Sequence, residues 1–413
     1  MCEAEVRGEQ IGSTELTFCP RRRGQSSSKA KSEYDITMST AGSIFLIFQA
    51  VYPYLLLLQE QQQQVGHPVR LRITGGTNVS CAPSYDYVEQ VLVPNLRRVG
   101  LPDLAVRLHG RGWSTGPIDL GAVTFEVHPL ATSAAVKDAK NTRFPRLNLS
   151  QYRRGSVARI DITILAPDTE LRDQEAQATN RRDRRANAHR HGTTGRHIRY
   201  DDDGMGFASD MTIRDYLEKK TQQAVSRVVR HLPETVVSRT PTSDSADLGR
   251  SDGDHSIPIQ LRTSEATQHH THLYILLVAH TSNGFRIGTD ALFDGFKDRD
   301  GRSEKSGRHL DHDSKLLSTL DQLVERCVTR FVEELEGRGS AEDGRHQPCV
   351  DVHMRDQLVI FDALGRHGNG NDHERDGKQA ADIEEDERYW SLHTQTAQWV
   401  CEQILGQGIW GKS

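Results

Sequence analysis

Residues 69–76 read Val-Arg-Leu-Arg-Ile-Thr-Gly-Gly, and this stretch sets the fold class. Its alternation places Val69, Leu71 and Ile73 on one face, as a half-buried strand requires, and the two glycines end the strand. Beyond the glycines, apolar residues recur at helical spacing until Gly100, which predicts a helix over residues 83–99 with a kink at Pro94. A strand, a glycine turn and a helix in this order favour an α+β fold.

Further strands and helices follow the same patterns. Alternating apolar residues predict strands over residues 123–127 and 160–164. An apolar strand over residues 273–279 precedes Asn283-Gly284, a strong hairpin signal. Helical spacing of apolar residues predicts helices over residues 211–232, 316–335, 354–364 and 396–405.

The most apolar segment, residues 44–58, reads IFLIFQAVYPYLLLL. It is shorter than the ~20 residues that a bilayer span needs, and it contains Gln49 and Pro53. These features favour a buried helix over a membrane span, so we expect no membrane partner.

Composition bounds the class of protein. A chain of 413 residues is long enough for two or three domains. Its hydrophobic share of 35% and charged share of 26% predict long polar insertions around a smaller core, above all between residues 167 and 256. The net charge of −5 gives no overall attraction to nucleic acid, so RNA contacts would need a local basic patch and DNA is not an expected partner.

The cysteines and the N-terminus indicate an intracellular protein. Six scattered cysteines form no Cys-x-x-Cys pair, which is typical of reduced thiols. The acidic residues near Met1 are unlike a secretory signal.

None of the histidine clusters has the four tightly spaced ligands that zinc prefers. These clusters are His189 with His191, His269 and His270 with His272, and His309 with His312. We therefore predict no metal cage built by the protein. The arginine-rich stretch 181–190 is read as solvated surface rather than as a phosphate site.

Polar residues inside apolar helices are the stronger site candidates. Gln49 and the Asp356-Gln357 pair each interrupt an apolar stretch, and His393 stands just ahead of the last predicted helix. A buried polar group must find a partner or face a polar cavity. From the residues alone, each is either a site residue or a satisfied structural group.

Four ordered blocks resemble the motifs of the RNA 3'-terminal phosphate cyclase family. They are Thr40 to Ser43 continuing through Gln49 to Pro53, Gly75 to Asn78 with Ala82-Pro83 and Asp86-Tyr87, Val350-Asp351 to Leu358, and Leu392 to Ala397. The resemblance runs from about Gly12 to Leu405 and is interrupted by the polar stretches.

The resemblance implies repeated β-α units, each a sheet backed by helices, with an inserted smaller α+β module. By this analogy residues 1–148 form the first part of the cyclase core, residues 149–297 the insert-type module with a long polar insertion, and residues 298–413 the C-terminal part of the core with the histidine motif. The family's first repeat, with its glutamate and several arginines, is expected to be missing from this chain.

The resemblance also implies the site residues. His393 would be the nucleophile that carries AMP, Gln49 would contact ATP, and Pro83 would lie against the nucleotide. Asp356 and Gln357 match the second ATP-binding segment, and His353 stands where the family often has tyrosine, which gives that contact a different shape.

The implied activity is the ATP-dependent conversion of an RNA 3'-terminal phosphate to a 2',3'-cyclic phosphate through a histidyl-AMP intermediate. ATP and Mg²⁺ are the implied cofactors, RNA with a 3'-terminal phosphate is the implied partner, and the nucleus (nucleoplasm or nucleolus) or the cytoplasm is the implied location. The sequence leaves the oligomeric state open.

Two alternatives remain. The chain could be a non-catalytic member of the same fold that acts in ribosome biogenesis or rRNA processing, or an inactive truncated cyclase. Non-catalytic relatives typically lack the histidine, so His393 favours the enzyme, whereas a missing first repeat favours an inactive chain.

Overall fold

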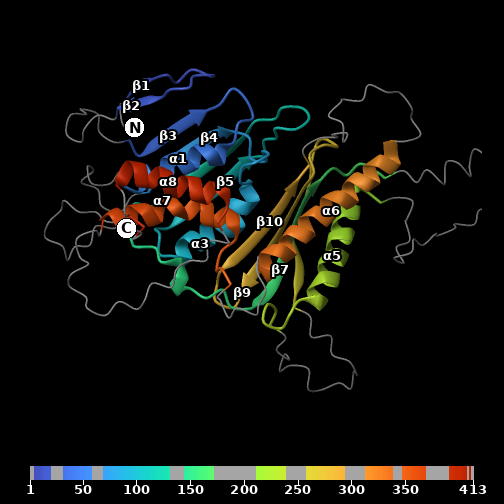
Figure 1. Ribbon diagram of the computed structural model, residues 1–413. Coiled ribbons are helices and arrows are strands. Elements are labelled where there is room, and N and C mark those ends of the chain that lie inside the picture. Colours follow the sequence, from blue (N-terminus) through green and yellow to red (C-terminus); the bar gives the residue numbers. More distant parts are fainter. Residues whose placement is uncertain are drawn as a thin grey trace, which may run out of the picture.

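The computed structural model describes residues 4–19, 31–57, 68–130, 144–171, 211–238, 257–293, 312–337, 347–368, 390–406 and 409–410. These residues form two four-stranded mixed sheets, each backed by helices, beside a small two-stranded ribbon of β1 (Glu5–Arg7) and β2 (Thr17–Cys19) (Figure 1). The α+β prediction is confirmed. The arginine-rich stretch 181–190, His189, His191 and His309 lie outside the described residues, as does most of the polar insertion.

The first sheet has the order β3-β4-β6-β5, with β3 and β4 parallel and the other pairs antiparallel. Its strands are β3 (Glu33–Thr37), β4 (Val69–Gly75), β5 (Leu104–Gly110) and β6 (Gly121–Val127). In β4, Val69, Leu71 and Ile73 are buried while Arg70 and Arg72 are exposed, as the alternation predicted. Helices therefore cover one face of this sheet, and polar side chains line the other.

Helix α1 (Ile44–Leu56) is the predicted buried helix in the apolar segment. Ser43 caps it, accepting a hydrogen bond from the Leu46 amide at 3.3 Å. Phe45 and Phe48 pack on Phe125 of β6, with ring centroids 5.9 and 4.0 Å apart. Among the described residues, no helix is both long and apolar enough to cross a membrane.

The next helix, residues 85–98, differs from prediction in its detail. It consists of α2 (Tyr85–Tyr87), a π-helical turn over Val88–Leu92, and α3 (Val93–Arg98). Pro94 lies in the first turn of α3, directly after the wider π turn, because proline offers no N–H for the preceding turn. Pro83 lies outside the helix, just before the N-cap residue Ser84.

The second sheet has the order β10-β9-β7-β8, and α5 (Ile213–His231) and α6 (His312–Glu336) pack on one of its faces (Figure 1). Its strands are β7 (Val157–Ala166), β8 (Ile259–Ala266), β9 (Tyr274–Thr281) and β10 (Arg286–Leu292). Gly284, with φ of 82°, makes the predicted hairpin turn between β9 and β10. The buried residues of α6 pack with those of this sheet. The division of the chain at residue 297 stays a prediction.

Polar contacts join the second sheet to helix 85–98. The Gln90 side-chain amide donates to Thr163 Oγ1 at 3.0 Å, and Asn95 Nδ2 donates to the Arg286 carbonyl at 2.8 Å. Ser84 and Tyr274 are also joined through their hydroxyl groups, 2.5 Å apart. The same helix thus contacts both sheets.

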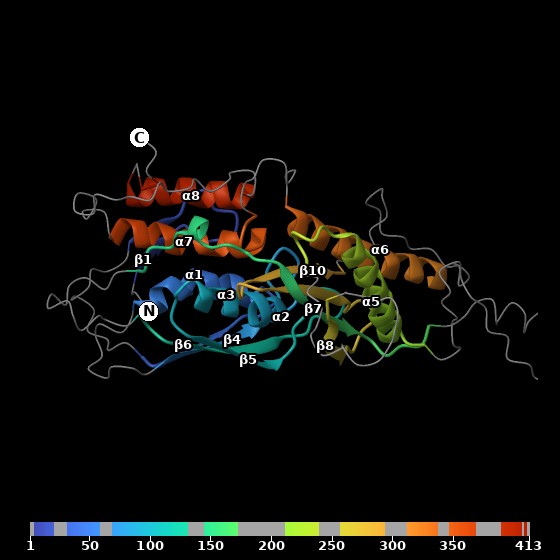
Figure 2. The ribbon, with the colours of Figure 1, turned by 90° about the horizontal axis from the view of Figure 1, so that it is seen from below.

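Helices α7 (Val352–Gly368) and α8 (Leu392–Leu405) form outer layers over α1 (Figure 2). The last helix begins four residues earlier than the predicted start at Thr396, because Ser391 caps it and accepts a hydrogen bond from the Thr394 amide at 2.9 Å. His393 consequently lies within the first turn of α8 and not ahead of it.

Candidate active site

A cleft of about 350 Å³ lies between α1, helix 85–98, α7 and α8. Its volume falls in the range of small-molecule sites, ~300 to 1,000 Å³. Four of its lining residues are among the predicted site residues: Gln49, Asp356, Gln357 and His393. The remaining lining residues are mostly apolar: Phe48, Tyr52, Leu92, Leu96, Val359, Ile360, Phe361, Thr396, Ala397, Val400 and Cys401.

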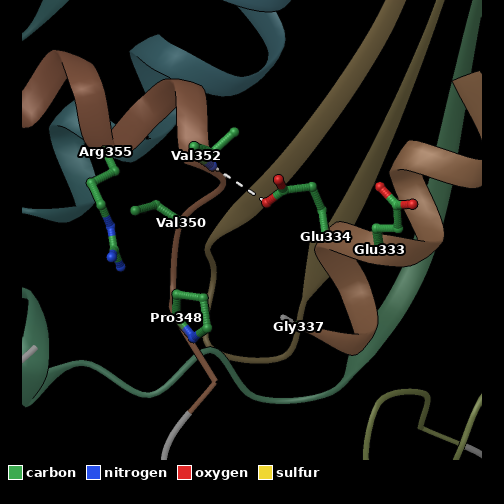
Figure 3. Close-up of a pocket in the computed structure, with 7 residues that line it drawn as sticks. All are labelled: Glu333, Glu334, Gly337, Pro348, Val350, Val352 and Arg355. Carbon is green, nitrogen blue, oxygen red and sulfur yellow. Dashed lines mark hydrogen bonds between the residues drawn. The ribbon is translucent and has the colours of Figure 1, made fainter. Parts of the chain in front are cut away.

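A second hollow, between the end of α6 and the start of α7, is far smaller (Figure 3). Its volume is about 10 Å³, which is room for one water at most. Glu334 closes one side of it and accepts a hydrogen bond from the Val352 amide at 3.3 Å. This hollow cannot hold a nucleotide, so the cleft is the candidate site.

Gln49 and Gln357 bring α1 and α7 together at the cleft. The Gln49 Nε2 group donates a hydrogen bond to Gln357 Oε1, although the two residues are 308 positions apart in the chain. Each amide has a further polar atom that a ligand in the cleft can contact. The pair therefore satisfies part of its hydrogen-bonding capacity internally and presents the rest to the cleft.

Asp356 holds the N-terminus of α8. Its Oδ1 atom accepts hydrogen bonds from Ser391 Oγ at 2.6 Å and from Thr394 Oγ1. Ser391 is the N-cap residue of α8, so a single carboxylate oxygen ties α7 to the first turn that carries His393. The sequence predictions did not include Ser391 and Thr394. A serine three residues before a threonine at a helix start was the signal that could have identified this helix cap.

His393 is exposed and is the second residue of α8. The first amides of a helix have no partner within the helix, and the helix dipole makes this end favourable for negative charge. An imidazole on the first turn, beside a cleft, is thus placed where a phosphate group can be stabilised.

His353 and Pro83 do not line the cleft. His353 is exposed on α7, three and four residues before Asp356 and Gln357, so it lies on the same helix face about one turn away. Its ring meets the edge of Tyr87, with centroids 6.3 Å apart. Pro83 is half-buried beside the start of α2. The cleft therefore brings together four of the six predicted residues.

Asp351, in the same sequence block as Asp356, is buried and structural. It accepts hydrogen bonds from Tyr87 Oη at 2.6 Å, from the Gly288 amide at 2.9 Å and from the Met354 amide at 2.8 Å. Burial raises the pKa of this carboxyl above its ordinary value. Asp351 thus fixes α7 against helix 85–98 and the second sheet.

Tyr52 is an unsatisfied polar group in the cleft wall. Its hydroxyl is buried, and within the described part of the chain it has no hydrogen-bond partner. Burial raises the pKa of this hydroxyl, so it is a neutral donor at physiological pH.

The described residues contain no group of three or more His, Cys, Asp or Glu side chains that could hold a metal ion. Of the predicted histidine clusters, His272 is buried and stacks on Trp113, with centroids 4.6 Å apart. Burial lowers its pKa, and a ring nitrogen lies 2.9 Å from the Thr115 carbonyl oxygen. This histidine is a packing residue.

Comparison with known proteins gives one family. The RNA 3'-terminal phosphate cyclase family matches residues 1–409. Among similar curated proteins, the RNA 3'-terminal phosphate cyclase of Korarchaeum cryptofilum (strain OPF8) is 39% identical over 99 residues, covering 24% of this chain and 25% of the relative. The protein of that name from Drosophila melanogaster is 36% identical over 125 residues, covering 29% and 31%.

The aligned segment thus spans between a quarter and a third of the length of these relatives. The family match, in contrast, extends over nearly the whole chain. The chain belongs to the RNA 3'-terminal phosphate cyclase family.

Proposed function

We propose that this protein uses ATP to convert an RNA 3'-terminal phosphate to a 2',3'-cyclic phosphate, with His393 as the carrier of AMP. The observation that supports this most is that His393 lines the cleft together with Gln49, Asp356 and Gln357. These residues come from three helices that are distant in the sequence, and family membership supports the same chemistry.

The cleft fits a nucleotide. Its apolar wall, which includes Leu92, Leu96 and Val359, suits a purine ring. The Gln49 and Gln357 amides provide polar contacts. Negative phosphate groups would then lie toward the N-terminus of α8. Pro83 and His353, which lie outside the cleft wall, are proposed to contact the nucleotide from its rim.

Magnesium fits as a companion of the triphosphate rather than as a resident of the protein. Among the described residues that line the cleft, Asp356 is the one carboxylate, and one of its oxygens already accepts two hydroxyl groups. Mg²⁺ commonly binds through substrate phosphates, waters and one or two carboxylates. The Oδ2 atom of Asp356 would be the protein's contribution, and the ion would neutralise phosphate charge.

The proposed reaction has three steps. A neutral ring nitrogen of His393 attacks the α-phosphorus of ATP, so that an N–P bond forms and the bond to pyrophosphate breaks. An oxygen of the RNA 3'-phosphate then attacks the adenylyl phosphorus and releases His393. Finally, the adjacent 2'-hydroxyl loses its proton and attacks the RNA phosphorus, which expels AMP and closes the ring.

In this proposal the chain's residues mainly position the groups. Asp356 fixes the turn that carries His393, and the two glutamines orient the nucleotide, since a correctly oriented nucleophile can supply much of the rate. RNA with a 3'-terminal phosphate is the proposed partner. The nucleus remains the predicted location, and imaging of a tagged chain would test it.

The test is incubation with α-labelled ATP and Mg²⁺, followed by denaturing gel and peptide mapping. Label should be acid-labile and should map to the peptide with His393. His393→Asn should abolish it, whereas His367→Asn, which changes an exposed histidine on α7 outside the cleft, should not. Label that persists in His393→Asn would refute the mechanism. If the unaltered chain takes up no label yet binds RNA, both alternatives become better assignments: a non-catalytic role in ribosome biogenesis or rRNA processing, or an inactive cyclase.

A further inference from the structure

A row of basic side chains crosses the second sheet away from the cleft. Arg159 on β7 pairs in register with His280 on β9, and His280 pairs with Arg286 on β10. Arg262 lies beside them on the edge strand β8. Side chains at paired positions lie on the same face of a sheet, so three arginines and one histidine gather at one place. We call these four residues the arginine cluster.

The arginine cluster surrounds one buried carboxylate. Asp161, only 3% exposed, accepts a hydrogen bond at Oδ2 from Arg159 Nη2 at 3.2 Å, and His280 Nε2 lies 2.8 Å from the same oxygen. Arg262 Nη1 is 3.8 Å from that oxygen as well. Arg159 Nε lies 2.9 Å from the other oxygen, Oδ1. A single carboxylate therefore serves three basic side chains, which is fewer acceptors than these groups can use.

Arg286 has the largest surplus of donors. Within the described part of the chain, its guanidinium donates one hydrogen bond, to the Gln90 carbonyl oxygen at 3.0 Å. Burial and the nearby charges of Arg262 and Arg159 lower the pKa of Arg286. A guanidinium has five N–H donors in a planar fork, so several of them remain for a ligand.

The charges of the cluster do not balance. Among the described residues, the carboxylates that face it are Asp161 and Glu89, which accepts a hydrogen bond from Arg262 Nη2 at 3.0 Å. Burial lowers the pKa of His280, which leaves this ring neutral at neutral pH. Three guanidinium groups against two carboxylates leave one positive charge, and a phosphodiester, with one negative charge, would neutralise it.

A ligand can reach this place from solvent. The side chains of Arg159 and Arg262 are 39% and 34% exposed, whereas the Asp161 side chain beneath them is buried. We propose that the arginine cluster binds a phosphate group of the RNA strand, with Arg286 and Arg159 as the principal donors. Arginine forks match phosphate oxygens in paired hydrogen bonds, which suits this role.

The position of the cluster favours RNA over a free phosphate ion, and this step rests on the proposed function. Helix 85–98 contacts the cluster through Glu89 and Gln90 and lines the cleft through Leu92 and Leu96. Residues 89–96 span about 10 Å along a helix. An RNA strand whose 3' end lies in the cleft can therefore place an upstream phosphate at the cluster.

The test measures fluorescence anisotropy of a short, labelled, single-stranded RNA with a 3'-phosphate on the full chain. Arg286→Gln and Arg159→Gln should each raise the Kd by about 10-fold and lower the slope of log K against log salt by about 0.7. Arg286→Lys keeps the charge and loses the planar guanidinium fork, so its Kd should lie between those of the unaltered chain and of Arg286→Gln. Arg214→Gln is the control. Arg214 lies on α5, away from the cluster, and forms an ion pair with Asp168 at 2.7 Å.

Three outcomes would overturn the proposal. Unchanged Kd and salt slope in Arg286→Gln and Arg159→Gln would show an internal ion-pair network only. Failure of the unaltered chain to bind RNA would also overturn the proposal. A calorimetric titration in which inorganic phosphate binds in an Arg286-dependent way, with RNA affinity unaltered by Arg286→Gln, would assign the cluster to free phosphate instead.

Failure of the proposed function is distinguishable from these results. Labelling of His393 from ATP needs no RNA, so Arg286→Gln should label like the unaltered chain. If no variant takes up label but RNA affinity still depends on Arg286, the catalytic proposal fails and the phosphate site stands.

Discussion

Replacing Asp356 with alanine should loosen the turn that carries His393 while the rest of the fold is retained. Asp356 reaches from α7 to α8 and accepts hydrogen bonds from the hydroxyl groups of Ser391 and Thr394. Without this carboxylate, α8 keeps its cap, because the Thr394 amide still donates to Ser391 Oγ. What is lost is the fixed position of the cap relative to α7.

The magnitude follows from the two hydrogen bonds. Hydrogen bonds to charged groups contribute about 1.5 to 3 kcal/mol each. Asp356 is only half-buried, and the two hydroxyl groups, 3.2 Å apart, can still bond to each other and to water. We therefore take about 1 kcal/mol for each, or about 2 kcal/mol in total, which corresponds to a roughly 30-fold change in a local opening equilibrium.

Amide hydrogen exchange of residues 394–398 measures this directly. Exchange should quicken by about 30-fold in Asp356→Ala, and Ser391→Ala, which does not touch the cleft, should reproduce much of the effect. The control is Asp215→Ala, because Asp215 accepts a hydrogen bond from Thr212 Oγ1 at 2.8 Å and holds the start of α5 from within its own helix. It should quicken exchange in α5 alone.

Exchange at residues 394–398 that stays unchanged in Asp356→Ala would refute this reasoning. An equal increase in Asp215→Ala would also refute it, since the effect would then reflect global stability and not the link between α7 and α8.

Three further predictions concern the framework around the cleft. Gly288→Ala should lower the stability by about 1 to 3 kcal/mol, because a Cβ there would lie 2.6 Å from Val91 Cγ2 and 2.9 Å from the Tyr87 ring. Gly110→Ala should leave the urea midpoint unchanged, because no other atom of the described residues lies within 4 Å of a Cβ at that position. Burial raises the pKa of Asp290, so its protonated form stabilises the fold fully below the ordinary carboxyl pKa of about 3.9, and that stability is lost as pH rises through the raised value. Asp290→Asn should thus gain stability relative to the unaltered chain as pH rises above the ordinary carboxyl pKa, measured by urea unfolding, and an opposite trend would count against it. Replacing residues 172–210 with a three-residue linker should preserve ATP binding and the melting temperature, because the Leu171 amide already donates to the Met211 carbonyl oxygen at 2.9 Å; loss of ATP binding in a folded variant would contradict this.

The spacing of apolar residues and the length of each pattern were enough to predict most helices and strands. The alternation of apolar residues in β4 and their helical spacing in α5 and α6 are strong signals, because each element has one buried face. Local signals failed where tertiary contacts decide. The π turn before Pro94 and the start of α8 at Ser391 depend on how neighbouring residues satisfy backbone groups, which apolar spacing does not report.

The same limit applies to the candidate site. Gln49, Asp356, Gln357 and His393 were conspicuous as polar residues beside apolar helical patterns, and the cleft brings all four together. Their partners were not visible, because the Gln49–Gln357 bond joins residues 308 positions apart. Asp351 shows the converse, since a carboxylate in a recognisable motif proves to be a buried structural group.

The contacts also explain why the second sheet matters to a cleft that it does not line. Helix 85–98 supplies Leu92 and Leu96 to the cleft, and its opposite contacts are with the second sheet through Gln90 and Asn95. Asp351 closes this arrangement, because it accepts hydrogen bonds from helix 85–98, from β10 and from the start of α7. The position of α7, and with it Asp356 and Gln357, therefore depends on the docked second sheet. Asp351→Ala should therefore weaken nucleotide binding, although Asp351 does not touch the nucleotide.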